Sequence, residues 1–413
     1  MKYGCIGEHL AHSFSREIHA LIADYEYELL ELSPNEVEPF MRAADFEAIN
    51  VTIPYKETVI PFLDELDEGA KLIGAVNTVV KRDGLLYGYN TDFYGMKALA
   101  RRAGIALCGK KVLILGTGGT SRTARAVAMS EGASECIVVS RKASNGTVSY
   151  SDAMKKHTDA QIIINTTPVG MFPKIFGKPI ELKGFHSLEG VIDAVYNPLR
   201  TPLVLEAEER GVKAIGGLYM LVAQGVRASE HFLDTKYDNA LTEAVFKKIL
   251  CDKTNIVLVG MPASGKSTVG AIIAEKLDRE LIDTDNSISE LSGKDIPTIF
   301  SERGEEVFRD IESLAIDRAS AECGKVIATG GGAILRRANV SSLRENGKIY
   351  FIDRPLAKLM PTEDRPLASD KEAIARRYAE RYDKYKAAAD LTVSEDESAE
   401  VIAKIILKDF LKG

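Results

Sequence analysis

Residues 260–270 read GMPASGKSTVG, and this stretch decides the fold of the C-terminal part of the chain. It lies between an apolar run, NIVLVG (255–260), and a segment with helical spacing, KSTVGAIIAEKL (266–277). A glycine, four spacers and Gly-Lys-Ser between a strand and a helix form a loop that wraps phosphates. Lys266 would reach the β- and γ-phosphates, and Ser267 would ligate Mg²⁺. The residues expected to contact ATP here are Ala263, Ser264, Gly265, Lys266, Ser267 and Thr268.

A second glycine-rich loop, GTGGT (116–120), has a different sequence motif. It follows the strand-like KKVLILG (110–116) and opens the helix-like TSRTARAVAMSEG (120–132), which is the order of a dinucleotide site. Its expected cofactor contacts are Gly116, Thr117, Gly118, Gly119 and Thr120. A plain strand–helix turn is the alternative.

The cofactor type is indicated by the end of the next strand, VVSRK (138–142). An acidic residue there would favour NAD, whereas Ser140, Arg141 and Lys142 include two cations, which suit the 2′-phosphate of NADP. A solvated, charged strand end is the alternative.

Strand-like and helix-like segments alternate along the chain, which predicts an α/β protein with parallel sheets. Strands are expected in EAINVTI, ECIVVS, AQIIINTT, GKVIATGG and GKIYFID, and a helical segment in YKETVIPFLDEL (55–66). We expect a substrate-binding α/β lobe at 1–95, a Rossmann NADP-binding lobe with returning C-terminal helices at 96–250, and a P-loop kinase domain with a parallel sheet at 254–413.

Composition narrows the class of protein. The chain has 45% apolar and 27% charged residues and a net charge of −7, which argues against nucleic acid as a partner. Its five cysteines are scattered, which fits a reducing compartment and gives no zinc pattern. No secretory leader or membrane-spanning run is visible, so we expect a cytoplasmic protein whose partners are small molecules.

Polar residues in the first lobe stand where a structural core would not need them. In order they form part of HSFS (12–15), NVTIPYKE (50–57), GAVNT (74–78) and GYNTD (88–92). Together they supply hydroxyls, amides, one ammonium and one carboxylate, a set that fits a small polyol acid. Taken singly, each would more often be a turn residue.

With NTTPVGM (165–171), DAVYNP (193–198) and GLYMLVAQ (217–224), this series resembles shikimate dehydrogenase. The resemblance implies that NADPH reduces 3-dehydroshikimate to shikimate, with Lys56 and Asp92 as the catalytic pair. The implied substrate contacts are Ser13, Ser15, Thr52, Lys56, Asn77, Asp92, Tyr196 and Gln224. The residues implied to lie near the cofactor are Glu68, Ala194 and Gly217.

The chemistry of this pair follows from charge. Hydride addition to a carbonyl carbon leaves negative charge on the oxygen, which the Lys56 ammonium can stabilise and protonate. Asp92 would favour the charged lysine and orient the substrate hydroxyl. Which of the two groups moves the proton stays open, and an ordinary surface ion pair is the alternative.

Polar features after the P-loop point to the phosphate acceptor. They are LIDTD (281–285), VFRDIE (307–312), ATGGGA (328–333), EDRPLA (363–368) and AERYDKY (379–385). Arginines and bare glycine backbone suit a small hydroxylated carboxylate, and an acid near its hydroxyl could take the proton. The two later arginines also have plainer explanations. Arg365 stands in RPL, which is a common tripeptide, and Arg381 lies in a charged helix that could simply be solvated.

This second series resembles shikimate kinase. The resemblance implies that ATP phosphorylates the 3-hydroxyl of shikimate, with Lys266 and Asp285 as catalytic residues. It assigns shikimate to Asp285, Arg309, Gly331 and Arg381, magnesium to Ser267 and Asp283, and a lid over ATP to Arg365.

The chain also departs from the two patterns. Arg16 and Ala20 replace a common Pro and Asn, Ser140-Arg141-Lys142 replaces Asn-Arg-Thr, and Lys358 stands where the lid often has Arg. Two other functions stay open. One is a ligand sensor without catalysis, which the presence of Lys56, Asp92, Lys266 and Asp283 disfavours. The other is a quinate dehydrogenase that uses NAD and is fused to the kinase, which the Ser140–Lys142 edge disfavours.

Overall fold

The computed structural model describes the whole chain except residues 12, 145, 360–370, 395–396 and 413. The chain divides into two compact units, Met1–Ile249 and Leu250–Gly413. The boundary between them lies within one helix, α9 (Asn239–Lys253). The two units are described separately below.

The first unit begins with a mixed six-stranded sheet in the order β2-β1-β3-β5-β6-β4. Its strands are β1 (Tyr3–Gly7), β2 (Tyr27–Glu31), β3 (Ala48–Val51), β4 (Glu65–Leu66), β5 (Thr78–Arg82) and β6 (Leu85–Tyr89). Helices α1 (Ser15–Ile22), α2 (Pro34–Ala43) and α3 (Glu68–Ile73) belong to this lobe. β5 runs antiparallel to both β3 and β6, so the expectation of a parallel sheet is wrong for this edge. The short turn between β5 and β6 forces a hairpin, since a parallel connection needs a longer crossover.

The helix expected over 55–66 is also wrong. This segment contains only the 3₁₀ turn η1 (Ile60–Phe62) and strand β4. Pro61 lacks an N–H and its ring disfavours a helix interior. Asp64 then joins the chain to β6, because its N–H donates to the Leu86 carbonyl (2.9 Å) and its side chain accepts from the Leu86 N–H (2.7 Å).

The second lobe of the first unit has a fully parallel sheet in the order β12-β11-β10-β7-β8-β9. The strands are β7 (Lys111–Leu115), β8 (Glu135–Ser140), β9 (Thr147–Ser149), β10 (Ile162–Asn165), β11 (Gly190–Asp193) and β12 (Lys213–Ile215). Helices α5 (Gly119–Ser130), α6 (Tyr150–Lys156) and α7 (Pro202–Glu209) connect them. β10 and β11 are buried along their whole length, as expected for a sheet covered on both faces.

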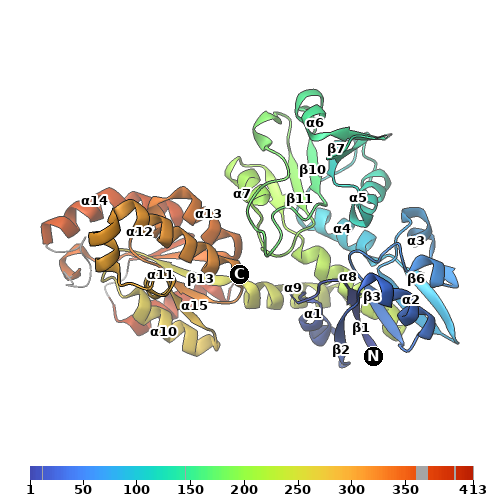
Figure 1. Cartoon of the computed structure of the whole chain (residues 1–413), viewed down its shortest axis with the longest axis horizontal. Helices are drawn as coiled ribbons and strands as arrows, with labels where there is room; N and C mark the ends of the chain where they lie inside the picture. The colour runs from blue at the N-terminus through green and yellow to red at the C-terminus, as the bar shows by residue number, and fades with distance from the viewer. Residues whose placement is uncertain (12, 145, 360–370, 395–396, 413) are drawn as a thin grey trace. The chain divides into compact units, whose positions relative to one another are not determined.

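Two long helices, α4 (Thr91–Arg102) and α8 (Leu218–Leu233), pack side by side in the first unit (Figure 1). A Cβ on Gly95 would stand 2.7 Å from the Met220 carbonyl oxygen, so only glycine permits this approach. α8 also packs on α1, where Gly225 faces Ile18. The packed helices α4 and α8 therefore link the two lobes of the first unit.

The second unit contains a parallel five-stranded sheet in the order β14-β15-β13-β16-β17. Its strands are β13 (Asn255–Val259), β14 (Leu281–Asp283), β15 (Val326–Ala328), β16 (Gly347–Ile352) and β17 (Leu391–Val393). The helices are α10 (Lys266–Leu277), α11 (Thr284–Ser292), α12 (Ile296–Ala321), α13 (Arg337–Asn346), α14 (Lys371–Ala388) and α15 (Ala399–Phe410), and η3 (Ala333–Leu335) and η4 (Leu356–Lys358) are 3₁₀ turns. β13 is buried along its whole length. Among the described residues, none of the helices combines the length and the apolar character that a membrane crossing requires.

Candidate functional sites

The predicted catalytic pair of the first unit forms a direct contact. Lys56 lies in the turns after β3, and its Nζ donates to Asp92 Oδ2 at 2.5 Å. Asp92 lies in the first turn of α4, where the helix N-terminus favours a carboxylate. The side chain of Asp92 is 1% exposed and that of Lys56 is 13% exposed. This burial distinguishes the contact from an ordinary surface ion pair.

Asn77 fixes the second oxygen of Asp92. Its amide donates to Asp92 Oδ1 (2.7 Å) and to Thr91 Oγ1 (3.0 Å), while its carbonyl oxygen accepts from the Thr91 N–H (2.7 Å). Sequence reasoning missed Thr91 as a support, although it stands inside GYNTD. With both carboxylate oxygens bound, Asp92 keeps its orientation toward Lys56.

Three predicted hydroxyl groups lie at the start of α1 and after β11. Ser13 Oγ donates to Ser15 Oγ (3.0 Å), and the ring of Phe14 packs edge-on against Tyr196 (5.2 Å). Burial raises the pKa of Tyr196 to about 12, and a hydrogen bond with Ser13 opposes that shift. Tyr196 therefore remains a neutral hydrogen-bond donor at neutral pH.

The other two predicted substrate contacts lie on neighbouring elements. Thr52 follows β3 and its methyl group lies against Gly7, where a Cβ would stand 2.6 Å away. Gln224 lies on α8, and its Cβ would be 3.1 Å from a Cβ on Gly95, one turn after Asp92. Gln224 is half-buried.

The first glycine loop lies next to Lys56. Gly116 has φ 110°, which favours glycine, and a Cβ there would stand 2.8 Å from Thr166 Oγ1. α5 begins at Gly119, whose Cβ would be 3.8 Å from Lys56 Cδ. A Cβ added to Gly118 would point into open space, because no described atom beyond the adjacent residues lies within 4 Å of it. A helix N-terminus with free space in front of it fits the pyrophosphate of a dinucleotide.

The strand end that is predicted to bind the cofactor, Ser140–Lys142, is accessible to solvent at Arg141 and Lys142. Arg141 and Lys142 are exposed at the end of β8, and the Lys142 N–H donates to Ser140 Oγ (3.3 Å). Thr117 and Thr120 accompany the glycines of the loop at the end of β7 and the start of α5. The exposed cations and the open loop fit NADP(H).

Ala194 and Gly217 are brought together, since a Cβ on Gly217 would stand 2.3 Å from the Ala194 carbonyl oxygen. Glu68 is exposed at the first position of α3, a helix that packs on α5. Sequence reasoning missed Asp193, which precedes Ala194 in DAVYNP. Asp193 is fully buried and accepts from Asn165, Thr201 and the Val195 N–H. Burial raises its pKa to about 6, and these hydrogen bonds hold the loop that carries Tyr196.

The backbone of the second glycine loop depends on its glycines. Gly260 (φ 156°) and Gly265 (φ 91°) adopt backbone angles that favour glycine, and Ala263 lies at φ 63°. Lys266 is 6% exposed, and its Nζ donates to the carbonyls of Gly260 (3.0 Å) and Met261 (2.9 Å). Ser267 and Thr268 are exposed in the first turn of α10.

The two predicted magnesium ligands contact each other. Ser267 Oγ donates to Asp283 Oδ2 (2.7 Å), and Asp283 Oδ1 accepts from the Asp285 N–H (3.0 Å). Mg²⁺ commonly takes one or two protein oxygens and completes its shell with water and phosphate oxygens. A hydroxyl and a carboxylate beside the phosphate loop fit that requirement.

The predicted acceptor site surrounds the glycines after β15. A Cβ on Gly330 would stand 2.6 Å from Asp285 Oδ1, and one on Gly332 would stand 1.8 Å from Arg309 Nη1. Arg381 Nη1 donates to the Gly331 carbonyl (2.9 Å). The structure therefore brings the two arginines, the acid and the glycine backbone into one site.

Two buried residues of this site were missed by sequence reasoning. Glu312 is 1% exposed and accepts from Arg309 Nη1 (2.7 Å), and burial raises its pKa, against the lowering effect of Arg309. Tyr385 donates to the Gly331 carbonyl (2.5 Å). The signal for Glu312 was its spacing, since it lies three residues after Arg309 on α12 and thus on the same helix face. The lid residue Arg365 lies outside the described residues.

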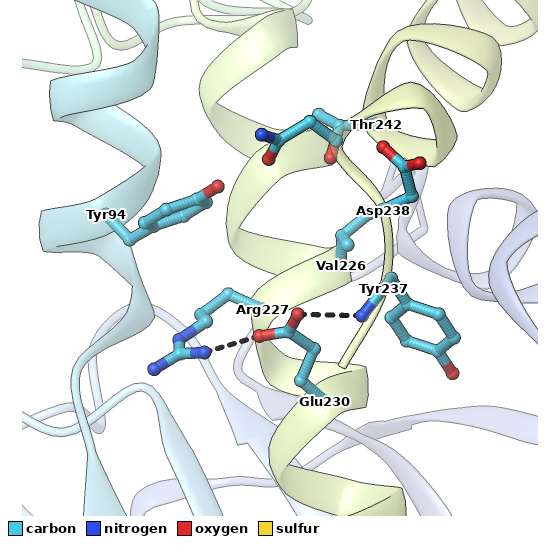
Figure 2. A pocket seen from close by; sticks show the side chains of 8 residues that line it. Tyr94, Val226, Arg227, Glu230, Tyr237, Asp238 and Thr242 are labelled. Carbon is cyan, nitrogen blue, oxygen red and sulfur yellow. Dashed lines mark hydrogen bonds and ion pairs between the residues drawn. The ribbon is translucent and has the colours of Figure 1, made fainter. Parts of the chain in front are cut away.

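A separate polar pocket lies between α4, α8 and the start of α9 (Figure 2). Its volume is about 20 Å³, which holds about one water molecule. Glu230 accepts there from the Tyr237 N–H (3.0 Å) and from Arg227. None of the predicted site residues lines this pocket.

The fold and the sites define an α/β enzyme with two nucleotide loops, a dinucleotide-type loop beside a lysine–aspartate pair and a P-loop beside an arginine-rich acceptor site. Residues 5–79 match the family model of the shikimate dehydrogenase substrate binding domain, and residues 262–410 match that of shikimate kinase. The chain is 34% identical over 266 residues to the shikimate dehydrogenase (NADP(+)) of Clostridium perfringens, covering 60% of this chain and 98% of that protein. It is 37% identical over 250 residues to that of Geobacillus kaustophilus, covering 55% and 91%.

Solved structures agree with these relatives. Shikimate dehydrogenase 1 from Peptoclostridium difficile has a TM-score of 0.56 and 33% identity, and covers 60% of this chain and 98% of its own. The Thermus thermophilus enzyme in complex with NADP(H) and shikimate has a TM-score of 0.54 and 28% identity, covering 60% and 99%. The chain belongs to the shikimate dehydrogenase family and carries a shikimate kinase domain after the dehydrogenase region.

Proposed function

We propose that this bifunctional shikimate-pathway enzyme makes shikimate 3-phosphate in two successive reactions. The first unit reduces 3-dehydroshikimate to shikimate with NADPH, and the second phosphorylates shikimate with ATP and Mg²⁺. The observation that carries the proposal is the convergence at each glycine loop. Gly119 adjoins Lys56 in the first unit, and Ser267 pairs with Asp283 beside the P-loop in the second. We also propose the domain limits 1–95, 96–250 and 254–413.

In the reductive reaction, NADPH supplies the hydride. We assign to the Lys56 ammonium the stabilisation of charge on the substrate oxygen, to which it can also donate a proton. Asp92 holds that ammonium at 2.5 Å, and Asn77 holds Asp92. The neutral Tyr196 phenol and the hydroxyls of Ser13, Ser15 and Thr52 are suited to hydrogen bonds with the remaining oxygens of the substrate, as is the Gln224 amide.

In the second reaction, ATP supplies the phosphoryl group and Mg²⁺ neutralises developing charge. Apart from one proton acceptor, the proposed roles of the chain are positional and electrostatic. Asp285 orients the 3-hydroxyl and accepts its proton, while Arg309 and Arg381 bind the shikimate carboxylate. Ser267 and Asp283 hold the metal, and Lys266 faces the phosphates.

Incubation of the purified protein with 3-dehydroshikimate, NADPH, ATP and Mg²⁺ tests the proposal directly. Mass spectrometry should identify shikimate 3-phosphate, with shikimate as the intermediate. Lys56→Ala should slow reduction by roughly 10²-fold or more and leave phosphorylation of added shikimate intact. Lys266→Ala should do the converse. Ligand binding without turnover at either site would instead favour the sensor.

The choice of cofactor has its own test. Arg141→Ala should raise KM for NADPH far more than KM for NADH, because the guanidinium would bind the 2′-phosphate. Equal changes for both cofactors would contradict the NADP assignment. Faster turnover of quinate with NAD than of shikimate with NADP would support the quinate dehydrogenase.

A further inference from the structure

An arginine outside every recognised motif lies at the P-loop. Strand β16 pairs in parallel with β13, with Phe351 opposite Val259, so both strands end at the same edge of the sheet. The ends are in close contact, since a Cβ on Gly260 would stand 2.7 Å from the Ile352 carbonyl oxygen. Arg354 follows two residues after Ile352 and therefore starts at this edge.

Successive side chains after β16 point in different directions. Asp353 accepts from the Tyr378 hydroxyl (2.9 Å) and from Ser394 Oγ (3.2 Å), which directs it toward α14 and the end of β17. The guanidinium of Arg354 instead lies at the P-loop, with Nη1 3.8 Å from the position of a Cβ on Gly265. Arg354 is half-buried, and within the described part of the chain it forms no hydrogen bond or ion pair.

The loop itself contains a polar group that has no hydrogen-bond partner among the described residues. Ser264 is 2% exposed, and its Oγ forms no hydrogen bond with any described residue. It lies inside the turn, 2.9 Å from the position of a Cβ on Gly260. Buried polar groups normally have hydrogen-bond partners, so an unpaired hydroxyl in this loop indicates a ligand with acceptor oxygens.

We propose that Arg354 binds a phosphate of the nucleotide in the P-loop, as a cation additional to Lys266. The inference rests on the proposed ATP site. A guanidinium matches the geometry of phosphate oxygens and keeps its charge at every working pH. Because the chain has a net charge of −7, a polyanion must be met by cations placed locally.

Isothermal titration of the full chain with ADP and Mg²⁺, without shikimate, tests this contact. Arg354→Met, which keeps the apolar stem, should weaken ADP binding by roughly 10-fold or more, and Arg354→Lys should weaken it less. Lys348→Ala is the matched control, because Lys348 lies at the opposite end of β16 and pairs with Asp409. This control should bind ADP as the wild type does.

Tripolyphosphate identifies the part of the nucleotide that Arg354 contacts. In Arg354→Met, the inhibition constant of tripolyphosphate should rise by the same factor as the Kd of ADP. Unchanged ADP binding would overturn the proposal, and so would a loss for ADP without a loss for tripolyphosphate, which would indicate contact with the base. Phosphorylation of shikimate by the wild type, measured separately, tests the proposed function alone.

Discussion

Replacing Gly332 with alanine tests whether Arg309 must keep its position for shikimate to bind. A Cβ on Gly332 would stand 1.8 Å from Nη1 and 2.6 Å from Cζ of Arg309. The backbone of Gly332 (φ −104°, ψ −7°) is accessible to alanine. The added methyl group therefore acts on the guanidinium rather than on the loop.

The expected magnitude follows from the contacts of Arg309. The residue is 6% exposed, and its guanidinium donates to Glu312 (2.7 Å) and Glu305 (3.0 Å). It cannot avoid the methyl group without leaving Glu312. The hydrogen bond that a displaced Arg309 would lose is the one proposed with the shikimate carboxylate. A hydrogen bond to a charged group contributes about 1.5–3 kcal/mol, which corresponds to a change in affinity of roughly 10- to 150-fold. We expect the KM for shikimate to rise by that factor.

The assay is ADP release by the full chain at varied shikimate and saturating ATP. KM for ATP and the rate of 3-dehydroshikimate reduction should not change, and the reductase activity serves as a control for protein concentration. In the Arg309→Ala background, Gly332→Ala should have little further effect. A KM for shikimate within threefold of wild type, or additive effects in the double variant, would refute the reasoning.

Three further predictions concern stability and the first unit. Burial and the charge of Asp317 raise the pKa of Glu345 from 4.5 to about 8. The unfolded chain therefore releases this proton at a lower pH than the folded chain, and the second unit loses stability as pH rises between those values. Glu345→Gln should raise the Tm of the second unit more at pH 8 than at pH 5, as measured by calorimetry. Arg122 donates to Glu57 (2.9 Å) and to the Gly74 carbonyl (3.1 Å) across the lobes, and the side chains of Arg122 and Glu57 are both nearly half exposed. Glu57→Gln should therefore raise KM for 3-dehydroshikimate only a few-fold and reduce the salt dependence of that KM. An unchanged KM would show that the Arg122–Glu57 ion pair has no role in substrate binding. A fragment beginning at Leu250 should have a higher urea midpoint than one beginning at Asn255, because Arg279 donates to the carbonyls of Cys251 (2.7 Å) and Thr254 (2.8 Å); equal midpoints would contradict this.

Elements with strong local signals could be predicted from the sequence. Both glycine loops stand between a buried strand and a helix, and β8 begins and ends at the residues of ECIVVS. Continuous apolar runs predicted the two parallel sheets correctly. The hairpin of β5 and β6 was not recognised, because apolar strands look alike whichever way their neighbours run. The apolar spacing of 55–66 suggested a helix, but Pro61 and the pairing of Asp64 with Leu86 determine its structure.

The candidate sites could be predicted in part. Side chains inside a motif, such as Asn77 and Asp92, were found, and the structure brings them into contact. Partners that only orient another side chain carry little local mark in the sequence, and for Glu312 the only mark was its three-residue spacing from Arg309 on α12. Asp193 holds its loop by accepting from Asn165, which is distant in the chain, and the burial of Glu312 depends on how α12 packs. Such residues emerge only when the three-dimensional packing is known.

On the proposed function, the two glycine loops differ because their anions have different fates. The first loop carries no lysine, and α5 begins at Gly119, directly after Gly118, where an added Cβ would meet no described atom beyond the adjacent residues within 4 Å. The nearby cation, Lys56, is held by Asp92 for the substrate oxygen, so the loop itself needs only to bind a pyrophosphate that stays intact. The second loop encloses Lys266, buried and bound to two loop carbonyls. A cation in that place stays with the phosphates while the bond to the transferred group breaks, which a helix N-terminus alone cannot match.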